Sequence, residues 1–181
     1  MRILVASILL LAALPAASAD RCAPLLPAGL VQQLSASFPE YRAPQESDNL
    51  SEDVKYNSEH GGSGCLGVAK GDYDADGRPD FAVGLSQSGG RGAVIVVALS
   101  RADHWELHKL DSWPDYRNRL FVDTEKAGTF ERVGSAEGPL GKGEVEHLRC
   151  PHDSVVFGAT ESTGVVYCYR KGRWLHTWVS D

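Results

Sequence analysis

The segment from residue 71 to residue 81 constrains the fold of this chain more than any other. Its sequence is GDYDADGRPDF, so that Asp72, Asp74, Asp76 and Asp80 fall within nine residues. Two carboxylates about 5 Å apart, at an effective dielectric constant of about 20, repel each other by roughly 3 kcal/mol. The loop therefore closes, and lets the segments on either side pair, only if a cation lies among these side chains.

Ca²⁺ is the cation that fits this spacing best. It takes about six to eight oxygen ligands in flexible geometry, whereas Mg²⁺ demands octahedral geometry and dehydrates reluctantly. Gly77 permits the sharp turn around the ion. An Asp-Gly-rich turn that binds nothing is one alternative, and a calcium ion that only staples the fold is another. The expected ligands are four carboxylates, the last bound directly or through water, and one main-chain carbonyl: Asp72, Asp74, Asp76, Asp80 and Arg78.

The loop is not an EF-hand but resembles another family of calcium loops. The twelfth position counted from Asp72 is Val83, where an EF-hand has a bidentate glutamate. Residues 68–83 (VAKGDYDADGRPDFAV) resemble instead the calcium loop of FG-GAP and VCBS-type repeats, found in integrin-like propellers and many secreted bacterial proteins. The resemblance implies that the loop joins two strands of a hairpin. Such propellers repeat the motif several times, and this chain has one copy, so we do not expect a complete propeller.

The end of the chain adds a looser resemblance. Residues 165–169 (VVYCY) and 174–181 (WLHTWVSD), taken with the single calcium loop, are similar to a group of small exported bacterial proteins of unassigned function. The resemblance implies an exported calcium-binding protein. It implies no reaction.

The N-terminus has the three regions of a secretory signal peptide. Met1 and Arg2 form a short positive region, residues 3–14 are almost wholly apolar, and residues 17–19 (ASA) are small, as signal peptidase requires. The apolar run is about a dozen residues, whereas a membrane-spanning helix needs roughly 20. We therefore expect a signal peptide over residues 1–19 with cleavage after Ala19, a periplasmic or secreted mature chain, and no membrane insertion.

Residues 20–181 are enough for one domain with a substantial core and too few for two domains that each have a core of that kind. The formal net charge is -6, and loss of Arg2 with the signal peptide makes it -7. Phosphate backbones attract clustered Lys and Arg, not an acidic surface. We therefore expect a single acidic domain that does not bind nucleic acid.

Four cysteines in an exported chain predict two disulfides, for which three pairings exist. The expected strands favour Cys22 with Cys65 and Cys150 with Cys168, and free thiols are the alternative. Cys150 and His152 also have the composition of a thiol nucleophile. A disulfide is the more common state of a cysteine in an exported protein.

The apolar pattern predicts a mainly β domain with one short N-terminal helix. Leucines at positions 26, 30 and 34 recur every four residues and predict a helix over residues 27–37. Residues 43–64 have no sustained period and predict a long loop. The run at residues 93–99 is apolar on both faces, as in a central strand covered on both sides.

Short β-type runs fill the rest of the chain. Residues 81–85 and 93–99 flank a glycine-rich turn at 88–92 and predict an antiparallel hairpin. The fold class is then an antiparallel sheet or meander, arranged as a sandwich or a partial, propeller-like sheet. Further strands are expected at residues 104–110, 120–122, 129–133, 145–148, 154–158, 164–169 and 173–179.

Few residues suggest catalysis. Glu144 and Glu146, about 7 Å apart on one face of an expected strand, have a separation that glycosidase carboxylates can have, and two solvent-facing glutamates are the alternative. His104 and His108 would lie about 13 Å apart on a strand, too far for one zinc ion. The sequence has no His-Glu-x-x-His, Gly-x-Ser-x-Gly or Walker motif.

Aromatic residues suggest a second kind of binding surface. Trp105, Trp113, Trp174 and Trp178 are placed to line a glycan or peptide surface, and packing in the core is the alternative. Trp174 and Trp178 are evenly spaced and so share one face of a strand.

The sequence as a whole favours an exported, non-enzymatic calcium-binding domain. Its role would be that of a binding module of the cell envelope, or of an inhibitor or immunity-type partner of another exported protein. The alternatives are a carbohydrate-binding module that uses the aromatic residues and a hydrolase that uses Glu144 or Glu146, or a metal-bound water.

Overall fold

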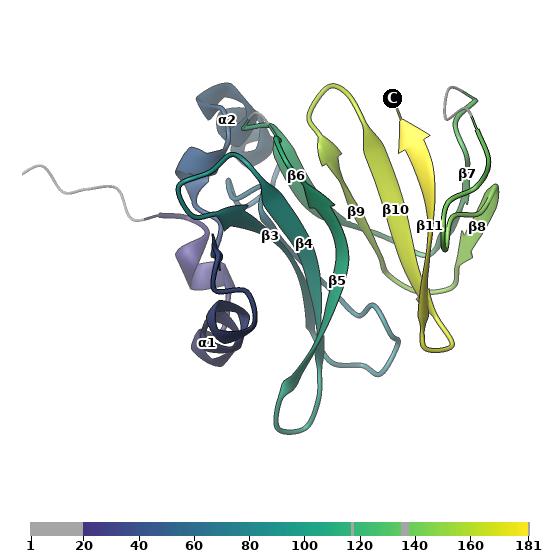
Figure 1. Ribbon diagram of the computed structural model, residues 1–181, viewed down its shortest axis with the longest axis horizontal. Coiled ribbons are helices and arrows are strands. Elements are labelled where there is room, and N and C mark those ends of the chain that lie inside the picture. Colours follow the sequence, from purple (N-terminus) through teal and green to yellow (C-terminus); the bar gives the residue numbers. More distant parts are fainter. Residues whose placement is uncertain (1–19, 117, 135–137, 181) are drawn as a thin grey trace, which may run out of the picture.

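The computed structural model describes residues 20–116, 118–134 and 138–180, and the predicted signal peptide, residues 1–19, lies outside them. The fold is mainly β and antiparallel, as predicted, with two facing sheets, two short helices and a separate hairpin (Figure 1). The helices are α1 (Ala28–Ser37) and α2 (Ser51–Glu59), with 3-10 turns at Ala23–Leu25 and Glu46–Asp48. The strands are β1 (Tyr41–Arg42), β2 (Val68–Gly71), β3 (Asp80–Gln87), β4 (Ala93–Ser100), β5 (Trp105–Trp113), β6 (Leu120–Glu125), β7 (Gly128–Glu131), β8 (His147–Cys150), β9 (Ser154–Ala159), β10 (Gly164–Arg170) and β11 (Arg173–Ser180).

The first sheet contains the predicted hairpin and the strand before it. Its order is β1-β3-β4-β5, and β2 also pairs with β3. In the β3–β4 hairpin, Phe81 lies opposite Ala98 and Ser86 lies opposite Ala93. The edge strand β5 has a bulge, because the register shifts between Ile95 and Val96 of β4.

The second sheet is built from the C-terminal half of the chain. Its order is β11-β10-β9-β6, so β6 lies beside β9 although a two-stranded sheet of β7 and β8 intervenes in the sequence. A turn at Lys171 and Gly172 joins β10 to β11, and both residues have positive φ, 49° and 78°. Such a two-residue turn matches the twist of the strands it joins.

Alternate residues of β4 bury their side chains in two different cores, as the apolar run predicted. Val94 and Val96 pack with α1, whereas Ile95 and Val97 pack against the second sheet. A third core lies on the outer face of the second sheet, where β7 and β8 cover β9 and β10. Figure 1 shows the resulting order of layers: α1, the first sheet, the second sheet and the β7–β8 hairpin.

Helix α1 agrees with the helix predicted over residues 27–37, but the long loop predicted over residues 43–64 is wrong in its middle part, where α2 lies. Only Val54 is buried in α2, so the sequence shows no apolar period there. The side chain of Asp53 accepts a hydrogen bond from Thr160 at 2.7 Å, which attaches the helix to the turn after β9.

Within the described part of the chain, no helix combines the length and the apolar character needed to cross a membrane.

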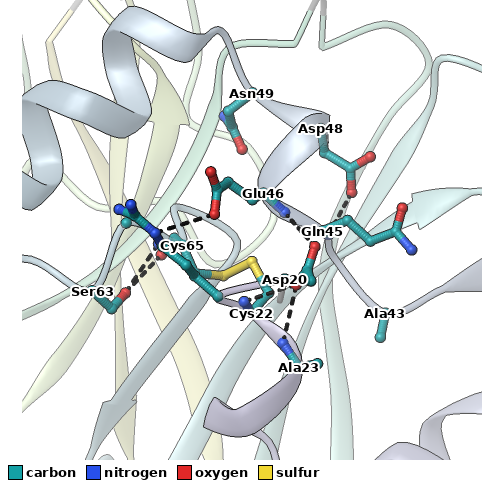
Figure 2. The surroundings of a disulfide bond; sticks show 12 residues. Asp20, Cys22, Ala23, Ala43, Gln45, Glu46, Asp48, Asn49, Ser63 and Cys65 are labelled. Atoms are coloured by element: carbon teal, nitrogen blue, oxygen red, sulfur yellow. Dashed lines mark hydrogen bonds and ion pairs between the residues drawn. A yellow bond between two sulfur atoms is a disulfide. The ribbon is translucent and has the colours of Figure 1, made fainter. Parts of the chain in front are cut away.

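The disulfide between Cys22 and Cys65 is present, as predicted, and ties the N-terminal segment to the start of the first sheet (Figure 2). Asp20 reinforces this junction, since its carboxylate accepts hydrogen bonds from the N–H groups of Cys22 at 2.8 Å and Glu46 at 3.0 Å. Arg21 pairs with Glu46 at 3.3 Å. The two segments are thus held by one covalent and several polar links.

The second predicted disulfide is not formed, because Cys150 and Cys168 are free, buried thiols. They were expected on neighbouring strands. Instead, β8 belongs to the hairpin layer and β10 to the second sheet, so the two residues face each other across the third core. A hydrogen bond between the thiols, together with burial, raises the pKa of Cys168.

Candidate metal centre

The aspartate loop joins β2 to β3, as the resemblance implied. These strands pair in antiparallel register, with Gly71 opposite Asp80. Gly77 has a φ of +83°, which confirms that glycine is used for the sharp turn. Ala75 also has positive φ, +62°, a conformation that is uncommon for a residue with a Cβ.

A buried tyrosine anchors the loop to both sheets. Tyr73 is fully buried, and its hydroxyl lies 2.7 Å from the hydroxyl of Thr124 in β6. Its main-chain N–H donates to the carboxylate of Asp80 at 2.8 Å. The loop is therefore fixed at its centre, and the aspartates on either side of Tyr73 are held close to β3.

Three carboxylates converge inside the loop. One oxygen from each of Asp72, Asp74 and Asp80 lies within 4.8 Å of the others, the one such group of potential metal ligands in the described residues. Asp80 has no exposed surface, and its second oxygen accepts a hydrogen bond from the N–H of Ser100 at 2.7 Å. Burial raises the pKa of Asp80 to about 6, and repulsion from Asp74 adds to the effect. A positive charge placed among these oxygens would offset both contributions.

Asp76 and the side chain of Arg78 lie beside this group of three. The carboxylate of Asp76 is outside the group of three and accepts a hydrogen bond from the N–H of Arg78 at 2.8 Å. The side chain of Arg78 approaches Asp76 only to 3.9 Å and is half-exposed. Asp72 meanwhile accepts hydrogen bonds from the N–H groups of Asp76 and Gly77, each at 3.0 Å, which shape the turn.

Arg101 is a member of the site that the sequence reasoning missed. Its guanidinium donates to Asp74 at 2.7 Å, lies 3.7 Å from Asp76 and also binds Glu106 at 2.7 Å. These contacts raise its pKa further above its usual value, against the opposing effect of burial. Arg101 directly follows β4, and the start of β3 lies beside the end of β4 in an antiparallel hairpin. The sequence predicted this hairpin, so its register could have placed Arg101 near Asp80.

Asp153 is the second missed residue. It precedes β9 in the second sheet, and its carboxylate accepts the N–H of Asp72 at 3.3 Å while pairing with Lys126 at 3.1 Å. No local pattern connects it with the loop, since more than seventy residues separate it from Asp80. It links the loop to the second sheet.

The chemistry of these donors fits a hard cation. The converging groups are all carboxylate oxygens, the ligands that Ca²⁺ and Mg²⁺ prefer. Each oxygen retains a lone pair beyond the hydrogen bond it accepts. Arg78 and Arg101 offset at most two of the four aspartate charges, so at least two negative charges remain for a divalent ion.

Comparison of the chain with protein-family profiles, with curated proteins and with solved structures finds no match.

The predicted pair of catalytic glutamates is not assembled on one strand face. Strand β8 begins at His147, and Glu144 makes only an isolated bridge to His176. Glu144 is bound by the N–H of Gly141 and by Arg132, each at 2.8 Å, and these contacts lower its pKa despite burial. A general acid needs a raised pKa, so this environment does not suit Glu144 to that role.

The tryptophans pack in the cores for most of their surface. Trp174 and Trp178 lie on β11, as their even spacing predicted, and pack with Trp113 against the core between the sheets. Trp105 packs against the core beneath α1. The four rings therefore form no common exposed surface, although the edge of Trp174 lines a depression.

His104 and His108 have separate partners and do not converge on one point. His108 lies within β5, 2.9 Å from the carboxylate of Glu106, whereas His104 precedes the strand and pairs with Asp103.

Proposed function

We propose that this chain is an exported, non-enzymatic domain that binds Ca²⁺ at the β2–β3 loop and acts by binding another component of the cell envelope. The observation that carries the calcium part is the convergence of Asp72, Asp74 and Asp80 within 4.8 Å, one of them fully buried. Asp76 and the main-chain carbonyl of Arg78 complete the proposed set of ligands.

The role of Ca²⁺ in this proposal is to complete the hairpin. Asp80 is the first residue of β3, and β3 pairs with β1, β2 and β4. A bound ion would offset the burial and the repulsion that raise the pKa of Asp80, and it would fix the start of the most connected strand. The ion is then a structural component, and binding of a partner takes place on the surface of the domain.

A binding role, rather than catalysis, is supported by the places of the candidate catalytic groups. The glutamate pair is not assembled, and Cys150 is a buried thiol away from the surface. The partner class we propose is another exported protein, for which this domain serves as an inhibitor, an immunity-type protein or a binding module. A disulfide between Cys22 and Cys65 is in keeping with an oxidising compartment.

The calcium proposal is tested by calorimetric titration of the chain from Asp20 onward. We expect one Ca²⁺ per chain, weaker binding of Mg²⁺, and affinity for Ca²⁺ lowered at least about tenfold by Asp74→Asn, since a ligand charge is lost. Asp103→Asn is the matched control, because the side chain of Asp103 is 86% exposed and lies outside the loop. No heat of Ca²⁺ binding, or equal affinity in the Asp74→Asn protein, would refute the proposal.

The binding role is tested separately by capture of proteins from a periplasmic extract on the immobilised chain. A single stoichiometric protein that is retained in the presence of Ca²⁺, and is competed by free chain, is the expected result. Absence of any such protein above background would contradict the partner class we propose and leave the calcium proposal standing.

A further inference from the structure

A cleft with acidic walls lies between α2 and the strand β6 (Figure 1). It has a volume of about 980 Å³, and the segment that leads from α2 into β2 also lines it. Leu66 and Val68 of that segment are buried and give the cleft an apolar part. Small-ligand sites have volumes of about 300 to 1,000 Å³, so this cleft lies at the upper limit of that range.

One face of α2 forms a wall of the cleft. The residues of this helix and its C-cap that line the cleft have the spacing of a single helical face, and they are Glu52, Asp53, Tyr56, Asn57 and His60. Val54, the one buried residue of α2, lies on the opposite side of the helix and fixes it to the domain. Because Glu52, Tyr56 and His60 are exposed, the face toward the cleft is available to a partner.

The outer face of β6 forms the facing wall. Phe121 and Asp123 alternate with Val122, whose side chain packs in the core between the two sheets. The side chains of Phe121 and Asp123 therefore point away from that core, on the side of the cleft. Phe121 is half-buried, and Asp123 is exposed. Lys70 of the adjacent strand β2 forms no ion pair with Asp123, so this carboxylate is available to a ligand.

The charge of the cleft is negative, and the cations of the chain do not neutralise it. Four carboxylates line the cleft, and no lysine or arginine does. Glu161 pairs with Arg119 at 2.8 Å. The carboxylates of Glu52, Asp53 and Asp123 have no ion-pair partner among residues 20–116, 118–134 and 138–180. Three negative charges therefore remain without a cation.

Other groups near α2 offset only a small part of this charge. Lys55, the cation within the helix, pairs with Glu59 at 3.7 Å, away from the cleft. Asp53 accepts a hydrogen bond from the hydroxyl of Thr160, which carries no charge. The dipole of α2 places roughly half a positive charge near Glu52 and Asp53 in the first turn. More than two negative charges thus remain in the cleft, and they attract cations.

An aromatic ring lies at the edge of the cleft. Tyr56 is 65% exposed, more than any other large apolar side chain of the described residues. Its ring stacks on His60 with centroids 3.9 Å apart and planes 25° apart, and Nδ1 of His60 donates to the main-chain carbonyl of Tyr56 at 2.8 Å. One face of the tyrosine ring is thereby covered, and the other is open. An ordered ring with an open face can bind an arginine or lysine side chain through a cation–π contact.

We propose that this cleft docks a basic segment of the exported partner protein, with one arginine or lysine over Tyr56 and further cations against Glu52, Asp53 and Asp123. These carboxylates do not converge on one point, because the aspartate loop is the one place in the described residues where three such groups do. Separated charges beside an apolar surface suit the cationic groups and aliphatic stems of a peptide better than a metal ion. The inference rests on the proposed binding role and is independent of the calcium site.

Calorimetric titration tests the cleft with an acetylated and amidated hexapeptide of alternating arginine and glycine. Its matched controls are the same peptide with citrulline in place of arginine, which removes the charge, and the polyamine spermine. In about 150 mM salt, where exposed charges interact only within about 8 Å, the arginine peptide should bind at least about tenfold more tightly than either control. Equal binding of either control, or no binding of the arginine peptide, would overturn the proposal; in the last case the acidic residues of α2 only stabilise the start of the helix.

Variants of exposed residues locate the binding site. Glu52→Gln and Asp123→Asn should each weaken binding of the arginine peptide by about threefold, the value of one exposed ion pair. Tyr56→Leu should weaken it by about twofold to fivefold, the value of an exposed cation–π contact. Glu59→Gln is the matched control and should change nothing, because Glu59 is an exposed carboxylate of the same helix that does not line the cleft. Equal weakening by Glu59→Gln, or none by the three cleft variants, would refute the site.

Capture of the partner from a periplasmic extract separates this inference from the function proposed above. A protein that the wild-type chain retains should be retained about tenfold less by the Glu52→Gln, Tyr56→Leu double variant, and fully by Glu59→Gln. Full retention by the double variant would refute docking in the cleft and leave the binding role standing. Binding of the arginine peptide with no retained protein would instead contradict the partner class and leave the cleft as a site for basic peptides.

Discussion

At the scale of single residues, Arg101 and a divalent cation are alternative counterions for the same carboxylates. Arg101 binds Asp74 and lies near Asp76, both of which belong to the aspartate loop. Without Ca²⁺, its guanidinium is the strongest positive group at the loop. With Ca²⁺ bound, the charge of the ion would take over much of that role.

This exchange predicts the behaviour of Arg101→Gln. In EDTA the substitution should lower the free energy of unfolding by about 1 to 2 kcal/mol, because a partly buried, charge-assisted pair is lost. In saturating Ca²⁺ the loss should fall to less than half of that value. Urea denaturation under both conditions measures it, with Arg78→Gln as the control expected to change stability by no more than about 0.5 kcal/mol. An equal loss in EDTA and in Ca²⁺ would contradict the exchange.

A second prediction concerns Asp48 and the way the free energy of unfolding depends on pH. Burial raises the pKa of this carboxyl, but hydrogen bonds from Arg42, the N–H of Gln45 and the hydroxyl of Ser86 outweigh burial and hold it below the usual 3.8. Because the folded pKa is the lower one, the stabilisation is present in full above pH 4 and is lost as the pH falls through the folded value.

Asp48→Asn should therefore cost about 2 to 3 kcal/mol at pH 7, where it leaves part of a buried pair unsatisfied. The difference from the wild type should shrink below pH 4, since a protonated aspartate resembles asparagine. Urea denaturation between pH 2.5 and pH 7 would measure this, with Asp103→Asn as the exposed control. A difference that stayed constant over this range would show that the carboxylate charge does not contribute.

At the scale of elements, the sequence predicted what is local and strongly patterned. The apolar run of β4 indicated a strand with both faces buried, and the glycine-rich turn at residues 88–92 indicated its pairing with β3. The aspartate spacing led directly to Asp72, Asp74 and Asp80. Helix α2 was missed because Val54 alone is buried in it, so no apolar period exists to be recognised.

The disulfide at the N-terminal segment gives the prediction that belongs to this scale. Cys22 and Cys65 are 43 residues apart, and closing a loop of that length stabilises the folded chain by about 4 kcal/mol in the chain-entropy account. The double substitution Cys22→Ser and Cys65→Ser should lower the free energy of unfolding by about 2 to 4 kcal/mol.

The matched control for this substitution is the change of the free thiols Cys150 and Cys168 to serine, measured without reductant, which leaves the bridge intact. Dithiothreitol should destabilise the wild type and leave the Cys22→Ser, Cys65→Ser protein unchanged. A wild type that is insensitive to the reductant would show that the bridge does not restrain unfolding.

At the scale of the whole molecule, the arrangement of layers was beyond sequence reasoning. The residues of β6 carry no signal that this strand belongs to the second sheet, where it pairs with β9 about thirty residues later. The spacing of Cys150 and Cys168 does not indicate that the two residues face each other across a core instead of lying on paired strands. Asp153 likewise reaches the metal centre only through the packing of the sheets, whereas Arg101 reaches it through the β3–β4 hairpin.

These long-range links predict that loss of Ca²⁺ weakens the entire sandwich rather than the loop alone. The loop is attached to β3 through Asp80, to β6 through the hydroxyl of Tyr73, and to the second sheet through Asp153. With free Ca²⁺ at a hundred times its dissociation constant, binding adds about 2.7 kcal/mol to the free energy of unfolding. For a domain of this size that corresponds to a rise in Tm of about 5 to 10 °C.

Thermal unfolding followed by far-ultraviolet and near-ultraviolet circular dichroism should then give one transition that moves as a whole to lower temperature in EDTA. Asp74→Ala should reproduce the effect of EDTA in the presence of Ca²⁺, and adding EDTA to that variant should change nothing further. Asp103→Asn should retain the full response, since its carboxylate lies outside the loop. Identical Tm values with and without chelator would contradict a structural ion, and a second transition appearing in EDTA would show that the loop melts independently of the two sheets it joins.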